Sequence, residues 1–285
     1  MWEIIWDVFV DALLDSVKML PFLFGAYLLI EYIEHRASHR IQRILAGSGK
    51  YGPLGGALLG CVPQCGFSVT AANLYGGRII TLGTLIAVFL STSDEAIPVL
   101  LGLPGSGPVI LKLLACKVVI AIVAGFCVDG ALRLRKRSVP LNTAHVHDLC
   151  SDCDCEHSGI VVSALKHTIH IFLFIFLVSL VLGGAIAALG EEGLSALLLT
   201  GSVLQPLVAA LIGFIPNCAA SVVLTELFLT GSISFGAAVA GLCAGAGVGM
   251  AVLFKVNRNT RENLGIAALL YVISAGAGML ITLLG

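Results

Sequence analysis

Long apolar blocks constrain this chain more than any other feature of its sequence. Several of them reach about 20 residues, the length that a helix needs to cross the hydrocarbon core of a bilayer. The whole chain is 58% hydrophobic and 12% charged, with a mean hydropathy of +1.02, whereas soluble domains carry roughly 25% charged residues. We therefore predict an all-α polytopic membrane protein, surrounded by the lipid bilayer and without affinity for nucleic acid.

The positions of the basic residues predict the topology. No Lys or Arg occurs from residue 191 to residue 254. By the positive-inside rule, the three basic clusters are cytoplasmic, and the region near residue 191 and both termini lie outside the cell inner membrane. The clusters comprise Arg36, Arg40, Arg43 and Lys50; Arg133, Arg135, Lys136 and Arg137; and Lys255, Arg258 and Arg261.

Three apolar stretches, 52–75, 79–101 and 108–132, lie between the first two basic clusters. Three crossings cannot begin and end on the same side of a membrane. The first stretch is interrupted at "VPQC" (62–65), and such breaks are tolerated where they face protein or a water-filled cavity. We therefore expect this stretch to be a re-entrant hairpin that enters from the cytoplasm and returns there.

A shift of 153 residues aligns the two halves of the sequence without a gap. The first hairpin enters from the cytoplasm and its copy, 206–229, starts in the external region, so the sequence predicts two inverted-topology repeats, as in many secondary transporters. The first repeat covers 1–132 and the second 161–285, joined by a cytoplasmic His/Cys-rich loop at 133–160. The shift pairs Pro53, Gly60, Pro63, Cys65 and Ser68 with Pro206, Gly213, Pro216, Cys218 and Ser221.

Each repeat is predicted to contain about five hydrophobic elements. They are a spanning helix (10–33; 161–189), an interfacial stretch (about 36–48; 192–204), a two-piece re-entrant hairpin (52–75; 206–229), an interrupted helix (79–101; 232–254) and a last spanning helix (108–132; 264–284).

The interruptions of the two hairpins supply the first candidate binding residues. Pro63 and Pro216 each remove a backbone donor and break the helix, so that freed carbonyl groups and helix N-termini face the break. The alternative is a structural kink whose polar neighbours cap the second half-helix. The side chains that offer oxygen or sulfur ligands near the breaks are Gln64, Cys65, Ser68, Asn217, Cys218 and Ser221.

The sequence "LSTSDEAIP" (90–98) supplies a second set of candidates. Asp94 and Glu95 lie about 15 residues, or roughly 22 Å, into an apolar segment, where ionisable residues are costly and mark functional sites. The alternative is that Pro98 ends the helix early and places both acids near the external interface. The preceding hydroxyl side chains, which can bond to their own backbone and loosen the helix, are Ser91, Thr92 and Ser93. The counterpart in the second half, "AGAGVGM" (244–250), is equally suited to an unwound stretch.

Two further ionisable residues lie within apolar segments. Lys117 is roughly 13 Å into the last helix of the first repeat. Its ammonium group cannot easily reach water from there, so it is a candidate charge partner for Asp94 or Glu95. Glu226 is aligned with Asn73 by the repeat. It is predicted either to bind substrate or carry a proton, or to be an acid at the external interface.

The loop "HVHDLCSDCDCEHS" (145–158) has a composition unlike the rest of the chain. Its C-x-x-C spacing and flanking imidazoles are sufficient for a tetrahedral site for Zn²⁺ or a soft ion. We expect it to capture or sense a metal rather than to fold around one; the alternative is a linker whose cysteines are idle. The predicted ligands are His145, His147, Cys150, Cys153, Cys155 and His157.

The motifs "GCVPQCGFSVTAANLYGGR", "STSDEAIPVLL" and "GFIPNCAASVVLTELFLTG" resemble the bacterial and archaeal ten-transmembrane heavy-metal exporter family, whose members are labelled arsenic efflux proteins or manganese transporters. The similarity extends over nearly the whole chain. It implies an inner-membrane transporter that moves a metal or metalloid outward. The residues in the matching motifs are Pro63, Gln64, Cys65, Asp94, Glu95, Pro216, Asn217 and Cys218.

These patterns predict a secondary transporter, not an enzyme, that exports a divalent metal ion by alternating access at a midplane site between the two hairpins. Asp94 and Glu95 would supply charge, and Cys65 and Cys218 would supply thiols; carboxylates favour Mn²⁺, whereas thiolates favour Zn²⁺. A proton or ion gradient, or a partner, would supply the energy, since no nucleotide-binding P-loop occurs. A homodimer is compatible with these patterns, and no cofactor is expected besides Zn²⁺ in the loop.

Three alternatives remain open at this point. The first is a proton-coupled carrier of arsenic species or of an organic anion, which helix N-termini would attract. The second is a membrane metal sensor built around the 145–157 loop. The third, a thiol redox enzyme at Cys61 and Cys65, is disfavoured because Cys61 is matched by Phe214 and C-x-x-x-C is not the usual redox spacing.

Overall fold

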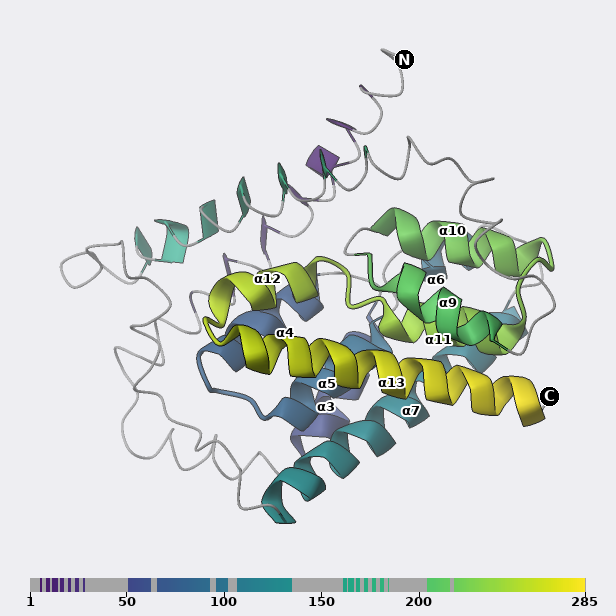
Figure 1. Cartoon of the computed structure of the whole chain (residues 1–285). Helices are drawn as coiled ribbons and strands as arrows, with labels where there is room; N and C mark the ends of the chain where they lie inside the picture. Colours follow the sequence, from purple (N-terminus) through teal and green to yellow (C-terminus); the bar gives the residue numbers. More distant parts are fainter. Residues whose placement is uncertain are drawn as a thin grey trace.

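The structure of the protein, a computed structural model, describes residues 51–62, 66–92, 96–101, 107–134, 204–215 and 218–284, with scattered positions between 6 and 28 and between 161 and 184. Helices, joined by turns and short irregular connections, make up these residues, and no strand occurs among them. The prediction of an all-α protein is thus confirmed for this part of the chain (Figure 1).

Two series of helices follow one another along the chain (Figure 1). The first comprises α3 (Gly52–Gly60), α4 (Gly66–Gly76), α5 (Leu82–Ser91), α6 (Ala96–Leu101) and α7 (Gly107–Leu134). The second comprises α9 (Gln205–Gly213), α10 (Cys218–Leu229), α11 (Phe235–Ala244), α12 (Val248–Val256) and α13 (Thr260–Leu284).

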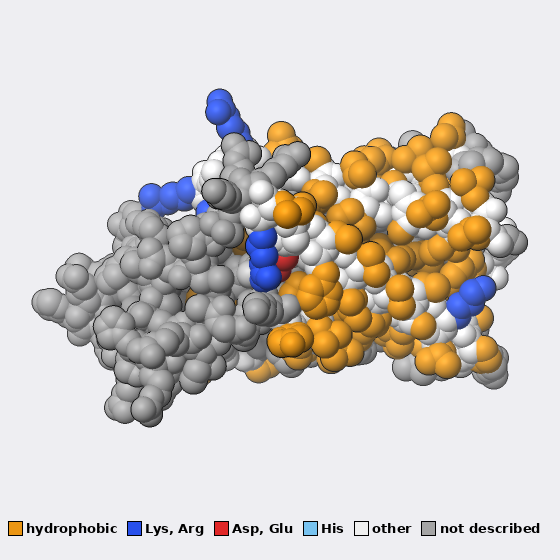
Figure 2. All heavy atoms as spheres, turned by 90° about the horizontal axis from the view of Figure 1, so that it is seen from below, with side chains coloured by type: hydrophobic (Ala, Val, Ile, Leu, Met, Phe, Trp, Pro, Cys, Tyr) orange, Lys and Arg blue, Asp and Glu red, His pale blue; other side chains and the backbone are white. Residues whose placement is uncertain are grey.

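Among the described residues, three helical segments are long and apolar enough to cross a membrane: Gly107–Leu134, Phe235–Val256 and Thr260–Leu284. The first and third expose large apolar side chains such as Leu111 and Leu280. Figure 2 shows hydrophobic side chains over most of the described surface on one face, with Lys and Arg side chains toward its ends. Apolar surface of this extent is stable against lipid rather than water, and the chain is a multi-pass membrane protein.

The helix bounds repeat at an offset of 153 residues. α3 and α9 cover 52–60 and 205–213, α5 and α11 cover 82–91 and 235–244, and α7 and α13 begin at 107 and 260. α5 and α11 also begin with the same cap. The hydroxyl groups of Thr81 and Ser234, both extended, accept hydrogen bonds from the backbone N–H three residues later. Equivalent sequence signals therefore start equivalent helices.

In each half, one central helix packs between two others: α5 between α3 and α7, and α11 between α9 and α13. Glycines permit this close approach. A Cβ atom added at Gly125 of α7 would lie 2.8 Å from the carbonyl oxygen of Gly83 of α5, and one added at Gly278 of α13 would lie 2.5 Å from that of Gly236 of α11. Small residues commonly let membrane helices approach in this way. As a result, α5 and α11 are buried over nearly their whole length.

The start of α5, the end of α7 and the start of α13 lie at one end of the molecule, called here the Arg78 end. The carboxylate of Asp129, near the end of α7, accepts a hydrogen bond of 2.8 Å from the backbone N–H of Gly83 in α5. Arg78, shortly before α5, forms an ion pair of 2.7 Å with Glu262 in the first turn of α13.

The start of α7, the start of α11 and the end of α13 lie together at the other end. Lys112 of α7 lies over the ring of Phe235, the first residue of α11, at 4.6 Å. A Cβ atom added at Gly236 would lie 2.1 Å from Oγ1 of Thr282, near the end of α13. Therefore α7 and α13 run in opposite directions, and so do α5 and α11.

Helices of the first half pack against helices of the second half. α4 contacts α12, α10 contacts α6, and α5 contacts α11. At the α4–α12 contact, a Cβ atom added at Gly249 would lie 2.8 Å from the Cβ atom of Ser68. The two halves are therefore interleaved rather than placed side by side.

The positions described between 6 and 28 and between 161 and 184 are helical. Those from residue 10 onward and all of the second set fall within the predicted spanning helices, whereas positions 6 and 9 precede the first of them. The rings of Phe9 and Phe176 meet edge to face with centroids 5.6 Å apart, so these two segments contact each other. The His/Cys-rich loop was predicted to begin at residue 133, but α7 continues to Leu134. The rest of the loop, both hairpin tips and nearly all of the predicted interfacial stretches lie outside the described residues.

Candidate functional site between the interrupted helices

Both central helices end in the interior of the protein, as the sequence predicts. α5 ends at Ser91, and Thr92 has left the helical conformation with φ −54° and ψ 127°. α11 ends at Ala244, and Gly247 has a φ of +54°, a value that glycine adopts without the strain of a Cβ atom. The backbone N–H of Ala246 bonds to Ala244 instead of to Leu242. The break thus frees the carbonyl group of Leu242, in the last turn of α11.

Lys117 joins the two helix ends. Its side chain is 0% exposed, and its Nζ atom donates a hydrogen bond to the carbonyl oxygen of Thr92 and another, of 2.7 Å, to that of Leu242. Helix C-termini carry partial negative charge, so both interactions favour the ammonium group. The prediction that Lys117 is buried is confirmed. The predicted pairing with Asp94 or Glu95 involves residues outside the described ranges.

The hydroxyl groups beside Lys117 bond to their own helix. Ser91 donates to the carbonyl oxygens of Ala87 and Val88, at 2.9 and 3.1 Å, and Thr92 donates to that of Val88 at 2.7 Å. Both residues are buried, and a hydroxyl group that donates retains lone pairs that can accept or coordinate. The predicted loosening of the helix by these hydroxyls coincides with the end of α5.

The remaining predicted residues that the structure describes lie on α4 and α10. Ser68, 0% exposed, is near the start of α4 against Gly249 of α12. Ser221 is half-buried in α10, and Glu226 is exposed further along the same helix. A role for Glu226 at the interface and a role in binding therefore both stay predictions.

Most of the other predicted ligands lie outside the described residues. Cys218 is an exception, because it is the first residue of α10. No group of three or more His, Cys, Asp or Glu side chains that could hold a metal occurs in the described part of the chain. The predicted residues outside this part are Pro63, Gln64, Cys65, Ser93, Asp94, Glu95, Pro216, Asn217, His145, His147, Cys150, Cys153, Cys155 and His157.

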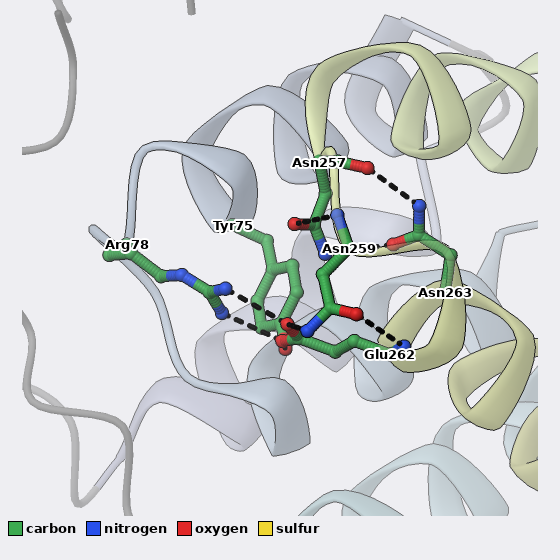
Figure 3. Close-up of polar contacts among 6 residues, drawn as sticks. All are labelled: Tyr75, Arg78, Asn257, Asn259, Glu262 and Asn263. Carbon is green, nitrogen blue, oxygen red and sulfur yellow. Dashed lines mark hydrogen bonds and ion pairs between the residues drawn. The ribbon is translucent and has the colours of Figure 1, made fainter. Parts of the chain in front are cut away.

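A polar network that sequence reasoning missed joins the two halves at the Arg78 end (Figure 3). Arg78 donates two hydrogen bonds, of 2.7 and 2.9 Å, to the carboxylate of Glu262, and the hydroxyl group of Tyr75 donates another. Hydrogen bonding to this carboxylate raises the pKa of the Arg78 guanidinium. Beside it, the buried side chains of Asn257 and Asn263 are hydrogen-bonded at 2.8 Å. The network links the segment after α4 to the start of α13.

The backbone of Arg78 is strained. Arg78 has a φ of +57°, and its equivalent in the second half, Gly231, has a φ of +75°. A residue with a Cβ atom is strained in this region by roughly 1–2 kcal/mol, whereas glycine is not. The sequence signal that could have pointed to this network is an arginine at a position where the second half has glycine. Its partner Glu262 lies far away in the sequence, so the signal alone does not identify the pair.

The fold and the site define a class: an all-helical, multi-pass membrane protein whose two central helices are interrupted around a buried charge. A family model described as "Putative, 10TM heavy-metal exporter" matches residues 2–195, more than half of the chain, and the chain belongs to that family. This confirms the family resemblance for residues 2–195, which contain the first two motifs; the third motif, at 213–231, lies outside the matched range. The comparisons with curated proteins and with solved structures gave no match.

Proposed function

We propose that the protein is a secondary transporter that exports a heavy-metal cation across the cell inner membrane. The observation that carries the proposal is the meeting of two interrupted helices, α5 and α11, which run in opposite directions and end beside the same buried lysine. Discontinuous helices of this kind form the substrate sites of many secondary transporters. The membership of an exporter family supports the direction of transport.

The segments that join the described helices would supply the metal ligands. One such segment, which connects Thr92 to α6, consists of Ser93, Asp94 and Glu95. The two acidic residues are therefore within three positions of Thr92, whose carbonyl group accepts a hydrogen bond from Lys117. Gln64 and Cys65 immediately precede α4, and Asn217 and Cys218 stand at the equivalent place before or at the start of α10. A set with carboxylate, amide and thiol groups suits Mn²⁺ or Zn²⁺.

Alternating access would follow from the relation between the halves. We interpret the halves as inverted-topology repeats, with the Arg78 end in the cytoplasm, where the positive-inside rule also places Arg133, Arg258 and Arg261. The α3–α4 and α9–α10 pairs would then be re-entrant hairpins entering from opposite sides. The contacts α4–α12 and α10–α6 are equivalent under the 153-residue offset, so the two could loosen in turn and open the site to one side at a time.

A proton-coupled carrier of an arsenic species or an organic anion is the second candidate. The buried ammonium group of Lys117 favours it, because a cation beside a substrate site would attract an anion. In that case Asp94 and Glu95 would carry protons rather than bind metal. The His/Cys-rich loop would serve as a cytoplasmic metal-capture or metal-sensing segment under either function.

Metal efflux from proteoliposomes tests the proposal. With Mn²⁺, Zn²⁺ and arsenite offered separately, we expect Asp94→Asn to reduce transport of one divalent metal at least tenfold, since it removes a charge that an isosteric amide cannot replace. Glu226→Gln is compared in parallel: unaltered transport would assign this exposed acid to the interface, and a loss of transport would assign it to binding. Arsenite transport without metal transport would favour the second candidate, and unaltered metal efflux by Asp94→Asn would refute the assigned ligand.

A further inference from the structure

Two backbone carbonyl groups converge on Nζ of Lys117, one from each interrupted helix. Thr92 contributes its carbonyl oxygen from the end of α5, and Leu242 contributes one from the last turn of α11. Freed carbonyls and half-helix C-termini are the groups that coordinate Na⁺ in transporters with discontinuous helices. Because such ends carry partial negative charge, this is a position built for a monovalent cation.

The ammonium group of Lys117 occupies this position. The Lys117 side chain is 0% exposed and reaches the two carbonyls from α7, a helix that belongs to neither interruption. A buried ammonium group is costly unless it is hydrogen-bonded, and the two helix ends provide the acceptors. In the second half, the position equivalent to Lys117 is occupied by the buried side chain of Leu270. The second half therefore supplies no ammonium group at the equivalent place.

We infer that Lys117 is a resident cation that takes the place of a bound Na⁺ or K⁺ between the ends of α5 and α11. The two helix ends are then held together without an ion from solution. Removal of the ammonium group leaves two buried carbonyl oxygens without a donor, which is unfavourable, and a small monovalent cation should bind in its place. This inference goes beyond the proposed metal export, because it concerns the ion that joins the helix ends and not the transported one.

The test is the thermal unfolding of the purified full-length protein in NaCl, KCl or N-methylglucamine chloride at equal ionic strength, without divalent metal. For Lys117→Ala we expect a saturable rise in Tm of several degrees in NaCl or KCl, since a ligand that binds only the native state stabilises it. The wild-type protein should have the same Tm in all three salts. Lys117→Ser, which adds a hydroxyl ligand, should respond at a lower concentration of the cation.

Two variants control for the cavity and for the loss of charge. Lys117→Met fills the space without a charge or an oxygen atom, and Leu270→Ala opens a cavity at the equivalent place; neither should respond to the choice of cation. An equal response in every variant, or none in Lys117→Ala and Lys117→Ser, would overturn the inference. Failure to recover both variants in any of the salts would also overturn it, because bound Na⁺ or K⁺ should rescue them. Transport does not enter this readout, so failure of metal export would be seen separately.

Discussion

At the scale of single residues, the two halves of the protein carry different side chains at two equivalent positions of the backbone. Lys117 is equivalent to Leu270, and Arg78 is equivalent to Gly231. Each charged member makes a contact between the halves: Lys117 with Leu242 of α11, and Arg78 with Glu262 of α13. The first half therefore supplies the cations that bind the second half to it.

The strain at Arg78 leads to a prediction about substitutions there. Arg78→Ala loses the ion pair with Glu262, worth roughly 1 kcal/mol for good bidentate geometry, and keeps a Cβ atom at a φ of +57°. Arg78→Gly loses the same ion pair but releases the strain. After the greater chain entropy of glycine is subtracted, we expect Arg78→Gly to be more stable than Arg78→Ala by about 0.5–1 kcal/mol.

Thermal unfolding in one detergent would compare the two Arg78 variants. Gly231→Ala provides the matched control, because the same strain should appear there without the loss of any ion pair. An alanine variant as stable as the glycine variant would show that the backbone at Arg78 carries no such strain.

At the scale of elements, the helix breaks follow from local chemistry and were predictable. The hydroxyl-rich segment after Leu90 and the glycines after Ala244 both weaken a helix by short-range effects, and α5 and α11 end at these places. The partners of Lys117 were not predictable, because backbone carbonyls have no sequence signature. The Arg78–Glu262 pair was also missed, since charges near helix ends served only as markers of topology.

Close packing of α7 and α13 leads to a prediction at the same scale. A Cβ atom added at Gly125 would lie 2.7 Å from Cβ of Pro53, and one added at Gly278 would lie 2.5 Å from Cβ of Ala240. Neither neighbour has a flexible side chain that can move aside, so Gly125→Ala and Gly278→Ala should each destabilise the protein by about 1–3 kcal/mol.

The same two helices provide controls for these glycine substitutions. Gly130 of α7 and Gly276 of α13 have no atom within 4 Å of an added Cβ, so alanine there should be neutral or stabilising by up to about 1 kcal/mol through helix propensity. Denaturation of the four variants would be compared in parallel. A loss of stability at Gly130 equal to that at Gly125 would contradict the packing described for α5 and α7.

At the scale of the whole molecule, interleaving is the feature that relates structure to function. α4 packs on α12 and α10 packs on α6, so the proposed site would require both halves. The helices run in opposite directions in the two halves, and the Arg78 network fastens one end of the molecule (Figure 3). If the Arg78 end faces the cytoplasm, as proposed, opening of the transporter toward the cytoplasm would have to separate the groups of this network.

The most direct measurement is anomalous diffraction from crystals of the full-length protein grown with Mn²⁺ or Zn²⁺. The proposed function predicts one metal peak at coordination distance, about 2.0–2.3 Å, from oxygen or sulfur ligands in the segments 93–95, 64–65 or 217–218, close to the ends of α5 and α11. A peak confined to the His/Cys-rich loop, with none beside the interrupted helices, would contradict it.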